Sequence, residues 1–319
     1  MRILVLGAGG TGGYFGGRLA QSGADVTFLV RAPRAQQLDR DGLQLRSPLG
    51  DANIPVAHVT ADALPALSAS QPFDLVLLSC KAYDLDTAMA AIAPAMHTGA
   101  TVMPILNGLR HYPLLDAAFG RDHVLGGLCV ISAMKGPHGE ILHLGTLASM
   151  TFGERDGAAD SPRTRALARA CERAGIDHTL SAQINQALWA KFVFLTTLAA
   201  ATCLMRASVG DIVATDDGVE FMQGLYRECA AVAEAAGEQI AAEAQRNSIG
   251  LVTQTGSTLT ASMLRDLQAG QRVEAEHIVG DMLHRAREAG VVAPRLATAR
   301  CHLQAYEVGS ARGEISRTS

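Results

Sequence analysis

The chain has 319 residues, of which 48% are hydrophobic and 18% are charged, and its formal net charge is −4. This composition is typical of a globular protein and excludes a disordered chain, while the length predicts two domains. The slight negative charge offers no broad basic surface, so we expect neither nucleic acid nor a membrane as a partner.

The N-terminal segment predicts a strand, a glycine-rich turn, a helix and a second strand. Ile3–Leu6 is uninterrupted by polar residues, as in a strand buried on both faces of a parallel sheet. A helix over Tyr14–Ser22 and a strand over Ala24–Val30 follow. Glycines at G-x-G-x-x-G spacing in this context favour a dinucleotide-binding turn over a plain glycine-rich turn. We expect the backbone of this turn to bind the cofactor phosphates; its residues are Gly7, Ala8, Gly9, Gly10, Thr11 and Gly12.

The end of the second predicted strand indicates which dinucleotide is bound. Arg31 stands there, Arg34 follows, and no acidic residue lies between them. NAD-specific folds usually place an acid at this position, whereas a guanidinium can bind a 2′-phosphate through two parallel bonds. The alternative is a solvated surface arginine, and we favour NADP(H) as the cofactor.

Strands alternate with helices through the first half of the chain, which predicts a doubly wound α/β sheet. Helical segments include Leu85–Ala95, Leu114–Phe119 and Pro162–Ala174, and Ile176–Leu180 is expected as a final edge strand. The other predicted strands are Leu43–Arg46, Leu75–Ser79, Val102–Leu106, Val124–Leu128, Ile141–Leu144 and Ser149–Phe152.

The second half shows only helical periodicity, so we divide the chain into an α/β domain over 1–180 and an all-helical domain over 181–319. The segment Gly309–Ser319 is expected to be a loose tail. The predicted helices are Ser181–Met205, Gly218–Ala236, Gln239–Asn247, Met263–Ala269, Val273–Ala289 and Arg295–Val308.

Cysteine usage and hydropathy indicate a cytoplasmic protein. The six cysteines are scattered without a C-x-x-C pair, which predicts reduced thiols, four of them in apolar or helical stretches. Phe192–Met205 is uncharged but too short to span a bilayer, so we expect it in the core. No histidine or cysteine pattern predicts a metal site.

Two polar residues follow predicted strands, where ligands of doubly wound sheets bind. Lys81 follows Leu75–Cys80, and Asn107 follows Val102–Leu106. Position alone does not separate a binding role from a solvated loop lysine or, for Asn107-Gly108, a plain turn.

Three further residues of the helical half are candidates for chemistry. Lys191 lies in an almost entirely apolar helix, where its ammonium must either reach solvent or serve a purpose such as proton donation. Glu274 sits at the predicted start of a helix, which the helix dipole alone would explain, as it would for Glu276. Ser262 would ordinarily be interpreted as a helix N-cap.

Taken in order, these motifs resemble the ketopantoate reductase (2-dehydropantoate 2-reductase) family along nearly the whole chain. The resemblance implies a Rossmann domain followed by a helical domain, with NADPH as the cofactor. The matching stretches are Gly7–Gly12, Arg31, Lys81-Ala-Tyr, Asn107-Gly108, Gly126-Gly127, Phe152-Gly-Glu154, Trp189-Ala-Lys191, Ser262–Asp266, Gly270–Glu274, Gly280 and Ala289–Pro294.

The resemblance also implies roles for individual residues. Lys191 would be the general acid that protonates the ketone oxygen, and Glu274 would bind the nascent hydroxyl and orient the lysine. Ser262 would bind the substrate carboxylate. The remaining roles concern the cofactor: Arg31 for the 2′-phosphate, with Lys81 and Asn107 positioning the nicotinamide-ribose end against the substrate.

Two positions depart from the family pattern and bear on the substrate. Leu195, four residues after Lys191, and Leu259, three before Ser262, stand where the family places asparagines, so we expect apolar contacts there. The leading hypothesis is NADPH-dependent reduction of a 2-oxo acid, most simply ketopantoate to pantoate in pantothenate biosynthesis. The alternatives are a more apolar 2-oxo acid or a non-catalytic NADP(H)-binding regulator, and the assembly is left open, a homodimer included.

Overall fold

The computed structural model describes residues 1–312 and divides into two compact units. The first contains Met1–Leu106 and His111–Ile184, and the second contains the loop Asn107–Arg110 and the chain from Asn185 onward. The sequence placed the division at residue 180 and did not anticipate that a loop of the first half would pack with the second. The start of the expected tail is helical through Ala311, and residues 313–319 lie outside the described part of the chain.

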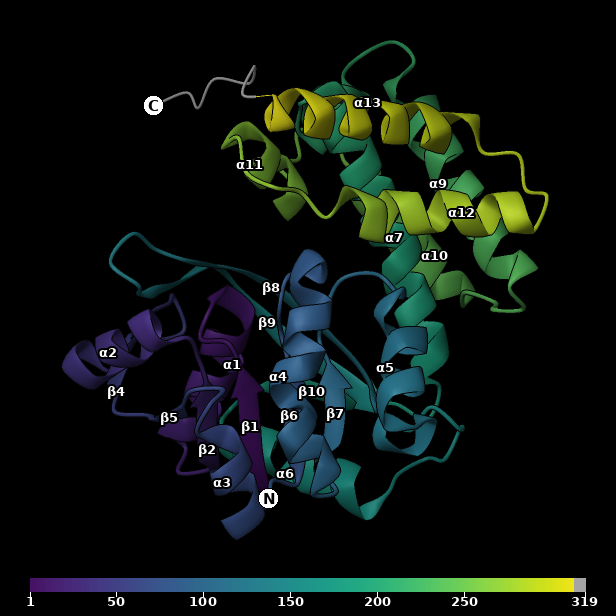
Figure 1. Cartoon of the computed structure of the whole chain (residues 1–319). Helices are drawn as coiled ribbons and strands as arrows, with labels where there is room; N and C mark the ends of the chain where they lie inside the picture. Colours follow the sequence, from purple (N-terminus) through teal and green to yellow (C-terminus); the bar gives the residue numbers. More distant parts are fainter. Residues whose placement is uncertain (313–319) are drawn as a thin grey trace. The chain divides into compact units, whose positions relative to one another are not determined.

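The first unit is built on an all-parallel sheet with the strand order β5-β2-β1-β6-β7 (Figure 1). The order reverses between β1 and β6, so the connections leave a crevice beyond the carboxyl ends of these two strands, where α/β proteins bind ligands. The strands are β1 (Arg2–Leu6), β2 (Asp25–Leu29), β5 (Ala57–Val59), β6 (Leu75–Leu78) and β7 (Thr101–Pro104).

A second, mixed sheet takes up strands that the sequence assigned to the parallel sheet. Its order is β10-β9-β3-β4, and β8 pairs with β9 in a long antiparallel hairpin. The hairpin register shifts between Ile131 and Ala133, so residues 144–147 of β9 bulge out of the pairing. The sequence pattern had divided this single strand into two, Ile141–Leu144 and Ser149–Phe152. The strands are β3 (Leu43–Arg46), β4 (Ala52–Ile54), β8 (Gly126–Lys135), β9 (Ile141–Gly153) and β10 (Asp177–Leu180).

Helix α1 (Gly10–Gln21) packs between the two sheets because glycines line its contacts. An added methyl group would lie 2.8 Å from Ile141 of β9 at Gly13 and 2.8 Å from Phe28 of β2 at Gly16. The predicted helix began four residues later, at Tyr14, because glycine is a poor helix former; tertiary packing overrides that local preference.

The remaining helices of the first unit include α2 and α3, which the sequence analysis did not predict. Helix α4 packs on β6 between α3 and α5, as seen in the blue segments of Figure 1. The helices are α2 (Ala32–Asp41), α3 (Leu64–Ser70), α4 (Leu85–His97), α5 (His111–Phe119) and α6 (Pro162–Arg173), with short 3-10 turns at η1 (Ala82–Asp84) and η2 (Arg121–His123).

The second unit is helical, and α9 contacts α8, α10, α12 and α13. Helix α7 is long and apolar enough to cross a membrane, but 67% of its most apolar window is buried within the protein, as expected of a core helix. The elements are α7 (Ile184–Met205), α8 (Val209–Val213), α9 (Gly218–Ala235), α10 (Ala242–Val252), α11 (Ser262–Gln268), the π-helical turn η3 (Glu276–Gly280), α12 (Asp281–Glu288) and α13 (Pro294–Ala311).

Candidate active site

The glycine-rich turn has the geometry of a phosphate-binding turn. Gly7 adopts a φ of +85°, which favours glycine, and its N–H donates to the Leu29 carbonyl at 2.9 Å. Gly9 caps α1 without a side-chain bond, and the space where its Cβ would lie is open. A ligand can therefore approach the backbone at the N-terminus of α1, where free N–H groups favour an anion. The turn fits a dinucleotide pyrophosphate.

Ser79 ties the two strands that flank the crevice. Its hydroxyl donates to the Leu6 carbonyl at the end of β1, at 2.9 Å, although Ser79 itself follows β6. A Cβ at Gly12 would overlap this hydroxyl, so glycine is required for the contact. Lys81 lies two residues further on, half-buried at the start of η1 and just past the carboxyl end of β6.

Arg31 and Arg34 stand in the same turn of the chain but have different surroundings. Arg31 precedes α2 with an exposed side chain, and within the described residues it forms no ion pair. Arg34 donates to the Ala8 carbonyl of the glycine-rich turn at 3.0 Å and to Gln37 at 2.6 Å. Burial lowers the pKa of Arg34. Arg34 therefore braces α2 against the turn, while Arg31 is available to a ligand.

The loop that carries Asn107 belongs to the helical unit, although it follows β7 directly. Asn107 is half-buried, and Gly108 has a φ of +81°. A Cβ on Gly108 would lie 2.9 Å from the carbonyl oxygen of His277 and 3.1 Å from its Cδ2. His277 is 9% exposed, and burial, aided by the charge of Arg110, lowers its pKa to about 4.

Lys191 is half-buried in α7, and Leu195 lies one turn later with a similar degree of burial. The neighbouring Phe192 and Val193 are buried. Thr196 is also fully buried, and its hydroxyl has no hydrogen-bond partner among residues 1–312. Because Thr196 is rotated by about 100° from Leu195 around the helix, it does not take the place of the family asparagine.

Ser262 is not a helix cap, contrary to its ordinary interpretation. Ala261 is the N-cap of α11, and Ser262 is the first helical residue, half-buried and without a side-chain cap bond. Two hydrogen bonds hold the preceding segment in place: the Leu259 carbonyl accepts from the Val209 N–H at 3.0 Å, and the Ala261 N–H donates to the Thr202 hydroxyl of α7 at 3.4 Å.

The structure distinguishes Glu274 from Glu276, which their shared position at the start of a predicted helix left equivalent. Glu276 is half-buried and accepts two hydrogen bonds from Arg300, at 3.1 and 2.9 Å. This ion pair gives Glu276 a structural role. Glu274 is only 7% exposed and precedes the π-helical turn η3, so the dipole of an exposed helix end does not account for it. Turns of this kind occur frequently at functional sites. The Glu274 carbonyl accepts from the N–H groups of His277 and Ile278.

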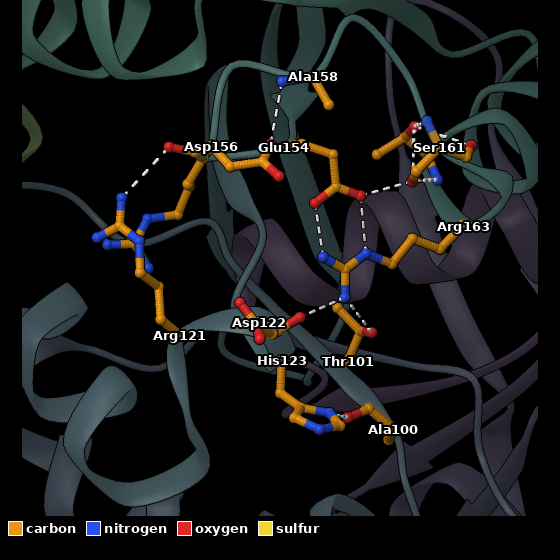
Figure 2. A network of polar contacts seen from close by, with 12 residues as sticks. Ala100, Thr101, Arg121, Asp122, His123, Glu154, Asp156, Ala158, Ser161 and Arg163 are labelled. Atoms are coloured by element: carbon orange, nitrogen blue, oxygen red, sulfur yellow. Dashed lines mark hydrogen bonds and ion pairs between the residues drawn. The ribbon is translucent and has the colours of Figure 1, made fainter.

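A polar network elsewhere in the first unit (Figure 2) borders an open pocket of about 500 Å³. Glu154 is 7% exposed and accepts from Arg163 at 2.8 and 2.5 Å and from Ser161 at 2.5 Å. Arg163 also donates to the hydroxyl of Thr101, the first residue of β7. The network therefore lies at the amino end of the parallel sheet, opposite the glycine-rich turn. We interpret it as a structural clamp.

The predicted site residues thus divide between the units. The glycine-rich turn, Arg31 and Lys81 belong to the first, while Asn107, Lys191 and the remaining candidates belong to the second. Sequence patterns did not predict the contacts of Ser79 and Arg34 or the burial of His277. A polar residue at the end of an apolar strand was the available signal for Ser79. Among the described residues, no group of three or more potential ligands could hold a metal ion.

The first unit carries a dinucleotide-type turn at the switch point of a parallel sheet. The helical unit contains a buried acid, Glu274, and a half-buried lysine, Lys191. These features together are typical of a two-domain oxidoreductase. Residues 3–157 match the family model described as ketopantoate reductase PanE/ApbA, and residues 183–307 match its C-terminal model. The chain belongs to the ketopantoate reductase family, which confirms the resemblance and the predicted fold class.

Individual relatives cover almost the entire chain. An uncharacterized oxidoreductase of Bacillus subtilis, YkpB, is 36% identical over 307 residues, covering 96% of this chain and 99% of that protein. A 2-dehydropantoate 2-reductase of Halobacterium salinarum is 29% identical, covering 93% and 96%. The crystal structure of 2-dehydropantoate 2-reductase from Methylococcus capsulatus superposes with a TM-score of 0.86 at 27% identity, covering 98% of each chain. D-mandelate dehydrogenase, solved with NADH and anilino(oxo)acetate, shares the fold at 21% identity, with a TM-score of 0.83 and coverage of 98% and 100%.

Proposed function

We propose that the protein reduces a 2-oxo acid to a 2-hydroxy acid with NADP(H). The observation that carries the proposal is Lys191, a half-buried ammonium in the otherwise uncharged α7 of a chain whose first unit has a dinucleotide-type turn. A non-catalytic regulator would need neither this lysine nor the buried Glu274. The family membership and its 2-dehydropantoate 2-reductase relatives support the same class of reaction.

The preference for NADP(H) rests on Arg31. Its side chain is exposed just after β2, at the position where the fold meets the adenosine ribose, while Arg34 secures the turn beside it. A guanidinium attracts a 2′-phosphate and would gain nothing from the 2′-hydroxyl of NAD. The NADH in the D-mandelate dehydrogenase structure makes NAD the competing cofactor for this fold.

A bound reduced nicotinamide supplies the hydride for the carbonyl carbon. Lys191 holds the proton for the carbonyl oxygen, and its positive charge stabilises the alkoxide as it forms. Glu274 accepts a hydrogen bond from the new hydroxyl and orients the lysine. Ser262, whose hydroxyl is not used for capping α11, binds the substrate carboxylate. Asn107 and Lys81 hold the nicotinamide-ribose end.

Ketopantoate is the reference substrate, because relatives of this chain are named 2-dehydropantoate 2-reductases. Leu195 and Leu259 favour a second candidate, a 2-oxo acid with an apolar tail, because leucine cannot bond to a substrate hydroxyl. The fold itself accommodates such a ligand, since the D-mandelate dehydrogenase structure contains anilino(oxo)acetate. We further propose that the enzyme is cytoplasmic and binds the cofactor and this acid, but neither nucleic acid nor a membrane. Measurement of the molar mass in solution distinguishes a monomer from a homodimer.

The test is steady-state oxidation of NADPH with a panel of 2-oxo acids, in which the products are identified. The panel contains ketopantoate and acids of similar size with branched aliphatic or aryl tails. Stoichiometric formation of a 2-hydroxy acid supports the proposal, and the ranking of kcat/KM values distinguishes the two substrate candidates. Absence of product with every acid, while NADPH still binds, would favour the regulator.

A further inference from the structure

His277 forms the surface on which the Asn107–Arg110 loop rests. The contact is close, because a single added methyl group at Gly108 would lie 2.9 Å from the His277 carbonyl oxygen and 3.1 Å from the imidazole. The positive φ of Gly108 also requires a residue that adopts the left-handed conformation readily. Both features restrict the position of Asn107, the preceding residue in the chain.

The same histidine is tied to the segment that carries Glu274. The N–H of His277 donates to the Glu274 carbonyl at 3.2 Å, and that of Ile278 donates to the same oxygen at 3.1 Å. Glu276, the first residue of the turn, is held by Arg300 of α13. These contacts fix the N-terminal end of the turn, from which His277 points toward Gly108.

We propose that His277 is a positioning residue that joins Asn107 and Glu274 into one preorganised element of the helical unit. This inference rests on the proposed function, in which Asn107 holds the nicotinamide-ribose end and Glu274 orients Lys191. Because the loop Asn107–Arg110 packs with the helical unit, the backbone next to Asn107 contacts the same turn that follows Glu274. Misplacing such a group by about 1 Å can cost as much as 100-fold in rate.

The test is a double-mutant cycle with His277→Ala and Asn107→Ala, measured both as the NADPH dissociation constant and as kcat/KM. We expect His277→Ala to weaken NADPH binding several-fold and to lower kcat/KM by about 10- to 100-fold. In the double variant, the loss should stay within about threefold of that in Asn107→Ala alone, because groups that act through one another are not additive. His284→Ala is the matched control: His284 is an exposed histidine of α12, and its loss should leave both quantities unchanged.

Multiplicative losses in the cycle, or unchanged kinetics and binding in His277→Ala, would overturn the inference, as would an equal loss in His284→Ala. If His277→Ala does not fold, Gly108→Ala replaces it from the opposite side of the contact, with the same expected coupling to Asn107→Ala. The binding arm requires no turnover. A wild-type protein that binds NADPH but reduces no 2-oxo acid therefore refutes the proposed function, while coupling in NADPH binding still decides the role of His277.

Discussion

Arg31 and Arg34 illustrate how two arginines three residues apart differ in their availability to a ligand. Arg34 is bonded to the glycine-rich turn, whereas Arg31 is exposed beside it. We expect Arg31→Ala to weaken NADPH binding by about 1.5–3 kcal/mol, the range for a hydrogen bond to a charged group, with NADH binding nearly unchanged. Titration of both cofactors measures this. The control is Arg40→Ala, which removes an exposed arginine of α2 that pairs with Asp41. Equal losses for the two cofactors would contradict the assignment.

Lys191 is the residue on which the chemistry depends. Lys191→Ala should lower kcat by roughly 10²–10⁴, the contribution of a general acid, with NADPH affinity near normal. Lys191→Arg keeps a positive charge but holds its proton too tightly to donate it, so it should not restore kcat. Steady-state kinetics and cofactor titration of both variants measure these effects. If the arginine variant has wild-type kcat, the ammonium merely extends from an apolar helix to solvent.

Leu195 carries the prediction about specificity. Its side chain lies one helical turn from Lys191, so both should face the same ligand. Burying a substrate hydroxyl against leucine costs about 1–3 kcal/mol when the hydroxyl is left unpaired. Leu195→Asn should therefore shift the ratio of kcat/KM toward ketopantoate and away from an apolar 2-oxo acid of similar size. Leu251→Asn, at an exposed position of α10, should leave the ratio unchanged. A wild type that already strongly prefers ketopantoate, with no change in the variant, would rule Leu195 out.

Among the elements, the ion pair between Glu154, at the end of β9, and Arg163 of α6 leads to a prediction about stability. Removing one partner of a buried ion pair costs roughly 3–5 kcal/mol, and we expect Glu154→Gln near the lower end because 31% of the Arg163 side chain is exposed. The bond from Arg163 holds the pKa of Glu154 below its ordinary value. The stabilisation is therefore present above about pH 4.3 and is lost as the pH falls below it.

Denaturant unfolding at pH 7 and near pH 3 tests this prediction. The difference between wild type and Glu154→Gln should narrow at the lower pH. Glu172→Gln, at an exposed position of α6, provides the control and should change the free energy of unfolding by less than about 0.5 kcal/mol. A difference between wild type and Glu154→Gln that does not change with pH would mean that the carboxylate charge is not what holds the clamp together.

The elements also show where sequence patterns lose information. The pattern predicted β3 exactly where it lies and most helices to within a few residues, because apolar periodicity follows burial directly. It failed at α1, where glycines pack between two sheets, and at β9, where a bulge resembles a break between strands. The predicted helix Val273–Ala289 corresponds to η3 and α12, which follow one another without a break, but the pattern did not reveal the π-helical turn.

At the scale of the whole molecule, the sequence predicted the family and the two-domain organisation, but not the membership of the Asn107 loop. A loop that follows a strand is expected to stay with its sheet, and only its three-dimensional contacts assign it to the helical unit. For the same reason, position in the sequence alone could not distinguish Glu274 from Glu276, and only the family resemblance selected Glu274. Burial of one acid and the arginine pairing of the other depend on contacts distant in the chain.

Transfer of deuterium from NADPH labelled at the reactive C4 position to a 2-oxo acid tests the central claim most directly, because it follows the hydride itself. The account predicts a 2-hydroxy acid that carries deuterium at C2 with wild-type enzyme, and a rate at least 100-fold lower with Lys191→Ala. It also predicts that unlabelled NADPH in deuterated water places no deuterium on that carbon. A wild-type protein that binds NADPH and leaves every 2-oxo acid unlabelled, or a Lys191→Ala variant that labels it at the wild-type rate, would contradict the account.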